Sequence, residues 1–207
     1  MLIGCGLAAL FTQLTLLMSM VATLLSIAYS VRIPGIKWRG KEIGGIDVLI
    51  DALGCGIVGI ILGYSIGGAI PDERVWWISI AFTITVAGSY AATQIFQLKA
   101  VDTYQTARNF STLFGAARAL KFGALLLIIG FIMIHSLITF EYFHEVFNNF
   151  IGYFYLFFIF IFLYGVFQCL KWSKNPFQNS TPQFKSVIYT LLTARLFWII
   201  AEWLRTT

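Results

Sequence analysis

Three cations stand at alternate positions just after the first apolar run, at Lys37, Arg39 and Lys41. In an extended segment, alternate side chains point the same way, so these three would present one cationic edge suited to phosphate oxygens. Arg108 lies in a second basic connection and is the fourth candidate for a diphosphate-binding site. On charge alone, the favoured alternative is that these residues set the membrane topology and bind lipid headgroups.

Asp102 is the candidate metal ligand, and it precedes Arg108 in the same connection. A carboxylate near basic residues at a membrane surface could hold a Mg²⁺ that bridges a diphosphate, since Mg²⁺ prefers a few carboxylates plus phosphate oxygens. The neighbouring residues Leu98, Lys99 and Ala100 supply no second carboxylate. Asp102 alone is therefore a weak metal site.

Four more ionisable residues, Asp51, Arg195, His135 and His144, lie within or beside apolar runs. A charge inside a membrane is costly unless it is paired or hydrated, so Asp51 and Arg195 are functional candidates. A structural ion pair or a hydrated pocket is the alternative for both. His135 and His144 could ligate a metal or a porphyrin-type pigment, but without a spacing motif ordinary hydrogen-bonded histidines are favoured.

Membrane-spanning helices must position these residues. Of the 207 residues, 59% are hydrophobic and 11% are charged, which is too little polar surface for a water-soluble domain. The composition predicts a single all-α transmembrane domain over residues 1–207, with about six helices in the lipid bilayer. Glycines at intervals of four in the second helix predict close helix contact there, at Gly59, Gly63 and Gly67. The expected spans are residues 3–30, 46–70, 75–97, 119–140, 148–170 and 186–204.

The basic residues are concentrated at one end of these spans. Connections one, three and five hold 11 of the 14 basic residues: Arg32, Lys37, Arg39, Lys41, Lys99, Arg108, Arg118, Lys121, Lys171, Lys174 and Lys185. The positive-inside rule then predicts cytoplasmic basic loops, with both termini on the non-cytoplasmic side. In a membrane protein this distribution matters more than the net charge of +5, so no nucleic-acid partner is expected.

The first half of the chain carries its features in a particular order. Tyr29-Ser30 closes the first span, a basic segment begins at Pro34, Gly45-Ile-Asp47 follows, and glycines recur from Gly54 to Gly68. This order resembles the UbiA superfamily of intramembrane prenyltransferases, especially its carotenoid and chlorophyll branches. Members of that family have nine helices, and the resemblance implies that the six spans here correspond to the last six.

The family's second aspartate motif is matched only in part. Asp102 and Gly115 keep its spacing of 13 residues, whereas Leu98 stands at the position of its first aspartate and Thr106 at that of its glycine. Family members ionise an allylic diphosphate with Mg²⁺ held between two aspartate motifs, after which the carbocation attacks an acceptor. The resemblance therefore implies remnant diphosphate contacts at the basic loops and, if the chain is catalytic, Mg²⁺ at Asp102.

The missing carboxylates and helices lead to two principal hypotheses. The leading one is a catalytically degenerate UbiA-like subunit of a larger membrane complex, which binds neighbouring helices, an isoprenoid, or a carotenoid or chlorophyll-type pigment. The alternative is the larger part of a split Mg²⁺-dependent prenyltransferase, with a separate chain supplying the missing helices. A small transporter or channel that uses Asp51 and Arg195 is a third class, although the sequence shows no internal repeat.

Overall fold

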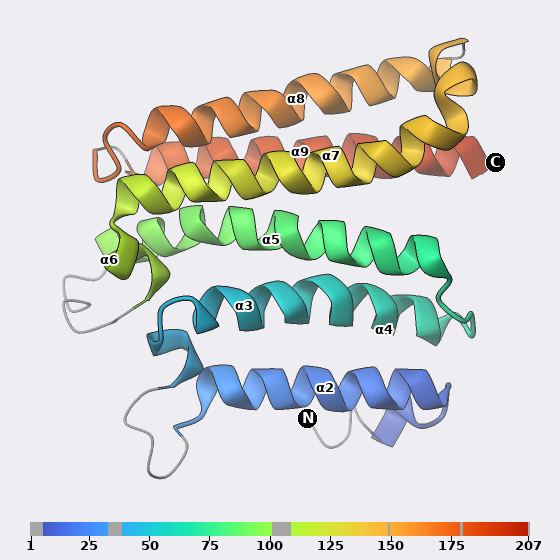
Figure 1. The fold of residues 1–207 in the computed structure, drawn as a ribbon, viewed down its shortest axis with the longest axis horizontal. Coiled ribbons are helices and arrows are strands. Elements are labelled where there is room, and N and C mark those ends of the chain that lie inside the picture. Colours follow the sequence, from blue (N-terminus) through green and yellow to red (C-terminus); the bar gives the residue numbers. More distant parts are fainter. Residues whose placement is uncertain (1–5, 33–38, 101–108, 149, 179, 207) are drawn as a thin grey trace.

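The structure is a computed structural model that describes residues 6–32, 39–100, 109–148, 150–178 and 180–206 (Figure 1). These ranges are helical apart from their connections, so the predicted all-α fold is confirmed. A 3-10 turn at Gly40–Glu42 precedes α3, and a π-helical turn at Gly54–Val58 joins α3 to α4. The helices are α2 (Gln13–Ser30), α3 (Ile46–Leu53), α4 (Gly59–Ile66), α5 (Glu73–Ala100), α6 (Phe110–Phe114), α7 (Ala116–Asn148), α8 (Phe150–Trp172) and α9 (Ser180–Thr206).

Within the part of the chain that the structure describes, four helical segments are long and apolar enough to cross a membrane. They are Gln13–Ser30, Ile46–Ile66, Glu73–Gln97 and Ala116–Ser136, and a shorter apolar helix runs from Leu156 to Trp172. Large hydrophobic side chains point outward, as at Leu24 and Phe160, which are 64% and 69% exposed. A surface of hydrophobic side chains suits lipid, and helices tolerate that environment because each one satisfies its own backbone hydrogen bonds. The chain is therefore an all-helical protein with helices suited to span a membrane.

The first long helix starts later than the sequence suggests, at Gln13 rather than near residue 3. The cause is local, since the Thr12 side chain accepts a hydrogen bond from the Thr15 backbone N–H at 3.0 Å and so caps the helix. A further unexpected element is α6, which lies in the connection before α7. Gly115, with φ of +81°, separates α6 from α7 in a backbone conformation that favours glycine.

The helices lie side by side in the order α2, α3–α4, α5 and α7, with α8 and α9 beyond them (Figure 1). One end of the bundle, on the left of Figure 1, holds the last residues of α2, α5 and α8 and the first residues of α3, α7 and α9. We call this the basic end. It is flanked by the described cations Arg32, Arg39, Lys41, Arg118, Lys121, Lys171, Lys174 and Lys185.

Small residues bring α5 and α7 into close contact. A Cβ atom added to Gly88 would lie 2.7 Å from the Gly123 carbonyl oxygen, and one added to Gly130 would lie 2.9 Å from the Ala81 carbonyl oxygen. Such spacing is the usual way in which membrane helices approach each other closely. In the second span, the close contact expected at Gly63 is absent within the described chain. A Cβ atom added to Gly63 would meet nothing within 4 Å.

The glycine that is packed in the second span is Gly56, in the π-helical turn. It lies against Thr83 of α5 so closely that no Cβ atom would fit. The Thr83 hydroxyl oxygen accepts a hydrogen bond from the Ile57 backbone N–H at 2.9 Å. A π-helical turn displaces backbone groups from the regular helical pattern, and here a neighbouring side chain satisfies one of them.

Candidate functional site

A buried polar cluster lies at the basic end, where α3 begins and α5 ends. We call Asp47, Gln94, Asn109 and Ser111 the Asp47 cluster. Asp47, Gln94 and Ser111 are 0%, 3% and 2% exposed, although they come from three separate segments. Buried polar groups are costly without partners, so the hydrogen bonds of this cluster decide whether it stabilises the fold.

Both oxygen atoms of the Asp47 carboxylate accept hydrogen bonds. Its Oδ1 atom accepts a hydrogen bond from the Gly45 backbone N–H at 2.8 Å, and its Oδ2 atom accepts from the Gln94 side-chain amide and from the Phe110 backbone N–H, the latter at 3.3 Å. Gly45 has φ of +91°, which turns its N–H back toward the first turn of α3. All three donors are neutral.

Gln94 joins the carboxylate to α6. While its amide nitrogen donates to Asp47, its Oε1 atom accepts from both the backbone N–H and the hydroxyl of Ser111, at 3.2 and 3.0 Å. Asn109 caps α6, because its side-chain oxygen accepts from the Thr112 backbone N–H at 2.9 Å. One amide therefore ties the start of α3, the end of α5 and α6 into one unit.

A pair of tyrosines extends this polar region one helical turn along α5. The hydroxyl oxygens of Tyr29, in α2, and Tyr90 lie 2.8 Å apart. Tyr90 and Gln94 are four residues apart, so they lie on one face of α5. That face consequently holds both Tyr29 and Asp47, two residues that carry the sequence resemblance.

The sequence offered a signal for this region that the choice of candidate sites did not use. Tyr29 and Asp47 are predicted only as parts of the resemblance, and Tyr90 and Gln94 belong to none of the predicted sites. Polar side chains spaced by one helical turn within an apolar span are unusual enough to mark buried interactions. What the sequence could not supply is the partner helix each of them faces.

Of the predicted diphosphate and metal residues, the structure describes Arg39 and Lys41. Lys37, Asp102 and Arg108 lie outside the described residues. Lys41 lies in the 3-10 turn, and the Arg39 guanidinium forms an ion pair with Glu42 at 2.8 Å. The Arg39 backbone N–H and side chain both donate to the Glu42 carboxylate and hold its pKa below the usual value.

The intramembrane candidates are partly described. Asp51 lies one turn beyond Asp47 on α3 and is half-buried. The side chains of Arg195 and His144 lie outside the described part, so pairing with Asp51 or ligation by His144 is untested. His135 packs between Phe131 and Phe158, with ring centroids 4.2 and 5.3 Å away. Its Nε2 atom is buried and has no hydrogen-bond partner among the described residues.

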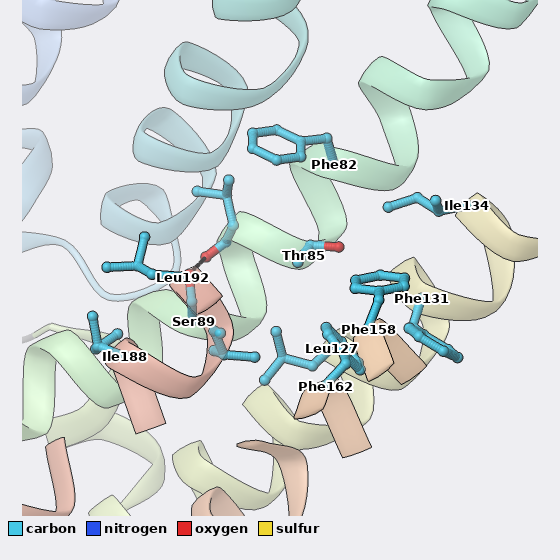
Figure 2. Close-up of a pocket in the computed structure, with 12 residues that line it drawn as sticks. Phe82, Thr85, Ser89, Leu127, Phe131, Ile134, Phe158, Phe162, Ile188 and Leu192 are labelled. Atoms are coloured by element: carbon cyan, nitrogen blue, oxygen red, sulfur yellow. Dashed lines mark hydrogen bonds between the residues drawn. The ribbon is translucent and has the colours of Figure 1, made fainter. Parts of the chain in front are cut away.

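A cavity of about 130 Å³ lies between α5, α7, α8 and α9 (Figure 2). Its depth is that of the middle of α5, within the segment long enough to span a membrane. α5 packs most closely against α7, and α8 against α9, so the cavity falls between two tightly packed pairs. It is lined by Phe82, Thr85, Val86, Ser89, Leu127, Phe131, Ile134, Phe158, Phe162, Ile188, Leu191 and Leu192.

Comparison with protein-family models, curated proteins and solved structures finds no match to this chain. Within the described residues, no three histidine, cysteine, aspartate or glutamate side chains lie close enough together to hold a metal ion. Two features of the described structure bear on function: the Asp47 cluster at the basic end and the apolar cavity in the middle of the helices.

Proposed function

We propose that this chain is a UbiA-like, catalytically degenerate subunit of a membrane complex, and that it binds the apolar end of an isoprenoid lipid or pigment. The supporting observation is the cavity between α5, α7, α8 and α9. Its walls are almost entirely aliphatic and aromatic, and a cavity without several polar partners does not retain water. At this depth in a bilayer, the apolar part of a lipid is the available occupant.

The engagement of the polar residues supports the loss of catalysis. A metal ligand needs free lone pairs facing the metal, yet the Asp47 carboxylate already accepts three hydrogen bonds from neutral donors. Arg39 is paired with Glu42 rather than directed toward a vacant phosphate site. Within the described residues no group of three possible metal ligands lies close together, and no catalytic step is assigned to Asp47.

The proposed topology keeps about six spans, with the basic end in the cytoplasm. The connections that follow α2, α5 and α8 all lie at the basic end in Figure 1, which supports a chain that crosses the membrane back and forth. The excess of cations at that end supports the cytoplasmic assignment. In this orientation the Asp47 cluster lies just beneath the cytoplasmic surface, and the cavity lies deeper in the bilayer.

A cavity-filling variant tests the proposed function. Ser89→Leu adds a branched apolar side chain inside the cavity, and Ser136→Leu makes the same change on the exposed surface of α7. Both serine hydroxyls donate to the carbonyl oxygen three residues earlier at 2.9 Å, so the controls are matched. After purification in nanodiscs and lipid extraction, mass spectrometry should find an isoprenoid or pigment with the parent and Ser136→Leu, and little with Ser89→Leu. Equal content in all three would refute lipid binding in this cavity.

The split prenyltransferase is the second candidate, and the exposed flank of the bundle favours it. Among its described residues α2 buries only Thr15, and a groove of about 480 Å³ runs between α2 and α4. Helices from a separate chain could cover this flank. A tagged chain should then co-purify with a partner of about three spans, and only the complex should transfer a prenyl group in the presence of Mg²⁺. Isolation of the chain without such a partner would remove this candidate.

A further inference from the structure

The volume of the cavity restricts what can enter it. At about 130 Å³ it is slightly smaller than an engineered cavity of about 150 Å³ that holds one benzene molecule. One six-membered ring, or an end group of similar size, fills that space. A porphyrin-type macrocycle is several times larger. Only the end of a longer molecule therefore fits between these four helices.

The walls of the cavity differ from side to side. Figure 2 shows Phe131, Phe158 and Phe162 on one side and Ile188 and Leu192 on the other, with Thr85 and Ser89 of α5 between them. The Phe131 and Phe162 rings stack with centroids 4.6 Å apart. Packed aromatic rings of this kind offer a flat, polarizable surface to a ring-shaped ligand.

The two hydroxyl groups give the cavity a directional polarity. The Thr85 hydroxyl donates to the Ala81 carbonyl oxygen at 3.0 Å, and the Ser89 hydroxyl donates to the Val86 carbonyl oxygen at 2.9 Å. Each proton is thus committed to its own helix, and each oxygen retains lone pairs that can accept a hydrogen bond. A ligand that brings an O–H donor satisfies them, whereas an ether or a ketone brings only further acceptors.

We infer that the cavity binds the hydroxylated ring of an apolar molecule, with the ring against Phe131 and Phe162 and the ligand O–H donated to Thr85 or Ser89. This inference rests on the proposed lipid-binding function and names the end group that the site selects. The remainder of the molecule extends out of the cavity between the helices into the bilayer.

A matched pair of small probes tests this selectivity. Binding of 4-fluorocyclohexanol and of its methyl ether to the full chain in nanodiscs can be followed by ¹⁹F NMR. The alcohol should bind more tightly than the ether by roughly two- to tenfold, which is the range expected for one neutral hydrogen bond. Equal affinities for the two probes in the parent chain would overturn the inference.

Variants distinguish the contribution of the two hydroxyl groups to binding from the contribution of the cavity volume. Replacing both hydroxyls, by Ser89→Ala with Thr85→Val, should abolish the preference for the alcohol while the ring still binds. Ser89→Leu should abolish binding of both probes, and Ser136→Ala should change neither. Survival of the alcohol preference after both hydroxyls are removed would contradict the inference.

A measurement on the parent chain keeps the test independent of how these variants fold. A photoreactive diazirine derivative of cyclohexanol should label peptides from the four helices that line the cavity, α5, α7, α8 and α9, and excess cyclohexanol should suppress that labelling. Labelling confined to other helices would overturn the inference. If the chain retains an isoprenoid lipid but shows no alcohol preference, the end-group inference alone fails. If it retains no such lipid in the cavity, the proposed function itself fails.

Discussion

Replacing Asp47 by asparagine should destabilise the chain substantially, although the two side chains have nearly the same shape. The amide supplies one acceptor oxygen where the carboxylate supplies two, so its NH₂ group must face either the Gly45 N–H or the two donors Gln94 and Phe110. Rotating the Gln94 amide would move the mismatch to Ser111, whose N–H and hydroxyl both donate to it. With hydrogen bonds to charged groups worth about 1.5–3 kcal/mol each, losing one or two costs about 2–5 kcal/mol.

Thermal unfolding in detergent, followed by circular dichroism, measures this loss. A cost of about 2–5 kcal/mol corresponds to a fall in Tm of roughly 5–15 °C for a chain of this length. Asp51→Asn is the matched control, one turn along the same helix and outside the cluster, and its Tm should change by a few degrees at most. Hydrogen exchange should also accelerate at the α6 amides of Asp47→Asn. If both variants melted within 2 °C of the parent, the assigned role of the Asp47 cluster would be wrong.

Three further predictions concern single contacts. His135→Phe should raise Tm, because it removes a buried nitrogen that has no hydrogen-bond partner among the described residues, which costs about 1–3 kcal/mol; a lower Tm would contradict this reasoning. Gly88→Val should lower the free energy of unfolding, measured by chemical unfolding, by about 1–3 kcal/mol, because the added Cβ meets the Gly123 carbonyl oxygen. Gly63→Ala, where the added Cβ lies in open space, should leave the free energy of unfolding unchanged or raise it. The pKa of Glu42 is lowered in the folded chain, so its ion pair with Arg39 stabilises the fold at pH values above the usual carboxyl pKa. This stabilisation is lost as the pH falls through the lowered pKa. Glu42→Gln should remove this small pH dependence of Tm, and an unchanged dependence would contradict the pairing.

The sequence predicted the features that follow from composition and short-range pattern. The low charge content and the apolar runs predicted an all-helical membrane protein, and alternating helices with clustered cations predicted a basic end. Local capping set the true start of α2 at Gln13, because the Thr12 cap outweighs the apolar character of the preceding residues. The short α6 was not predicted, since its five residues carry too weak a pattern.

The candidate site depended on contacts between segments far apart in the chain. Asp51 was chosen for its depth in an apolar run, but Asp47 is the buried carboxylate, because Gly45 and Gln94 fold donors around it. The glycines at 59, 63 and 67 suggested a close helix contact in the second span, whereas Gly56 makes it, against Thr83 of α5. Spacing identifies residues that share a helix face, but it does not identify the helix which that face meets.

The cavity was beyond sequence reasoning for the same reason. Its aromatic wall comes from α7 and α8, and its hydroxyl groups come from α5, so it exists only where two tightly packed helix pairs separate. The many phenylalanines of α8 are visible in the sequence, but their arrangement around a cavity the size of one ring is not.

Native mass spectrometry of the chain released from nanodiscs tests the central claim most directly, because it counts bound molecules on each chain. The account predicts that the parent and Ser136→Leu each retain about one apolar molecule, and that Ser89→Leu retains none. An equal bound mass on Ser89→Leu would contradict binding in the cavity between α5, α7, α8 and α9.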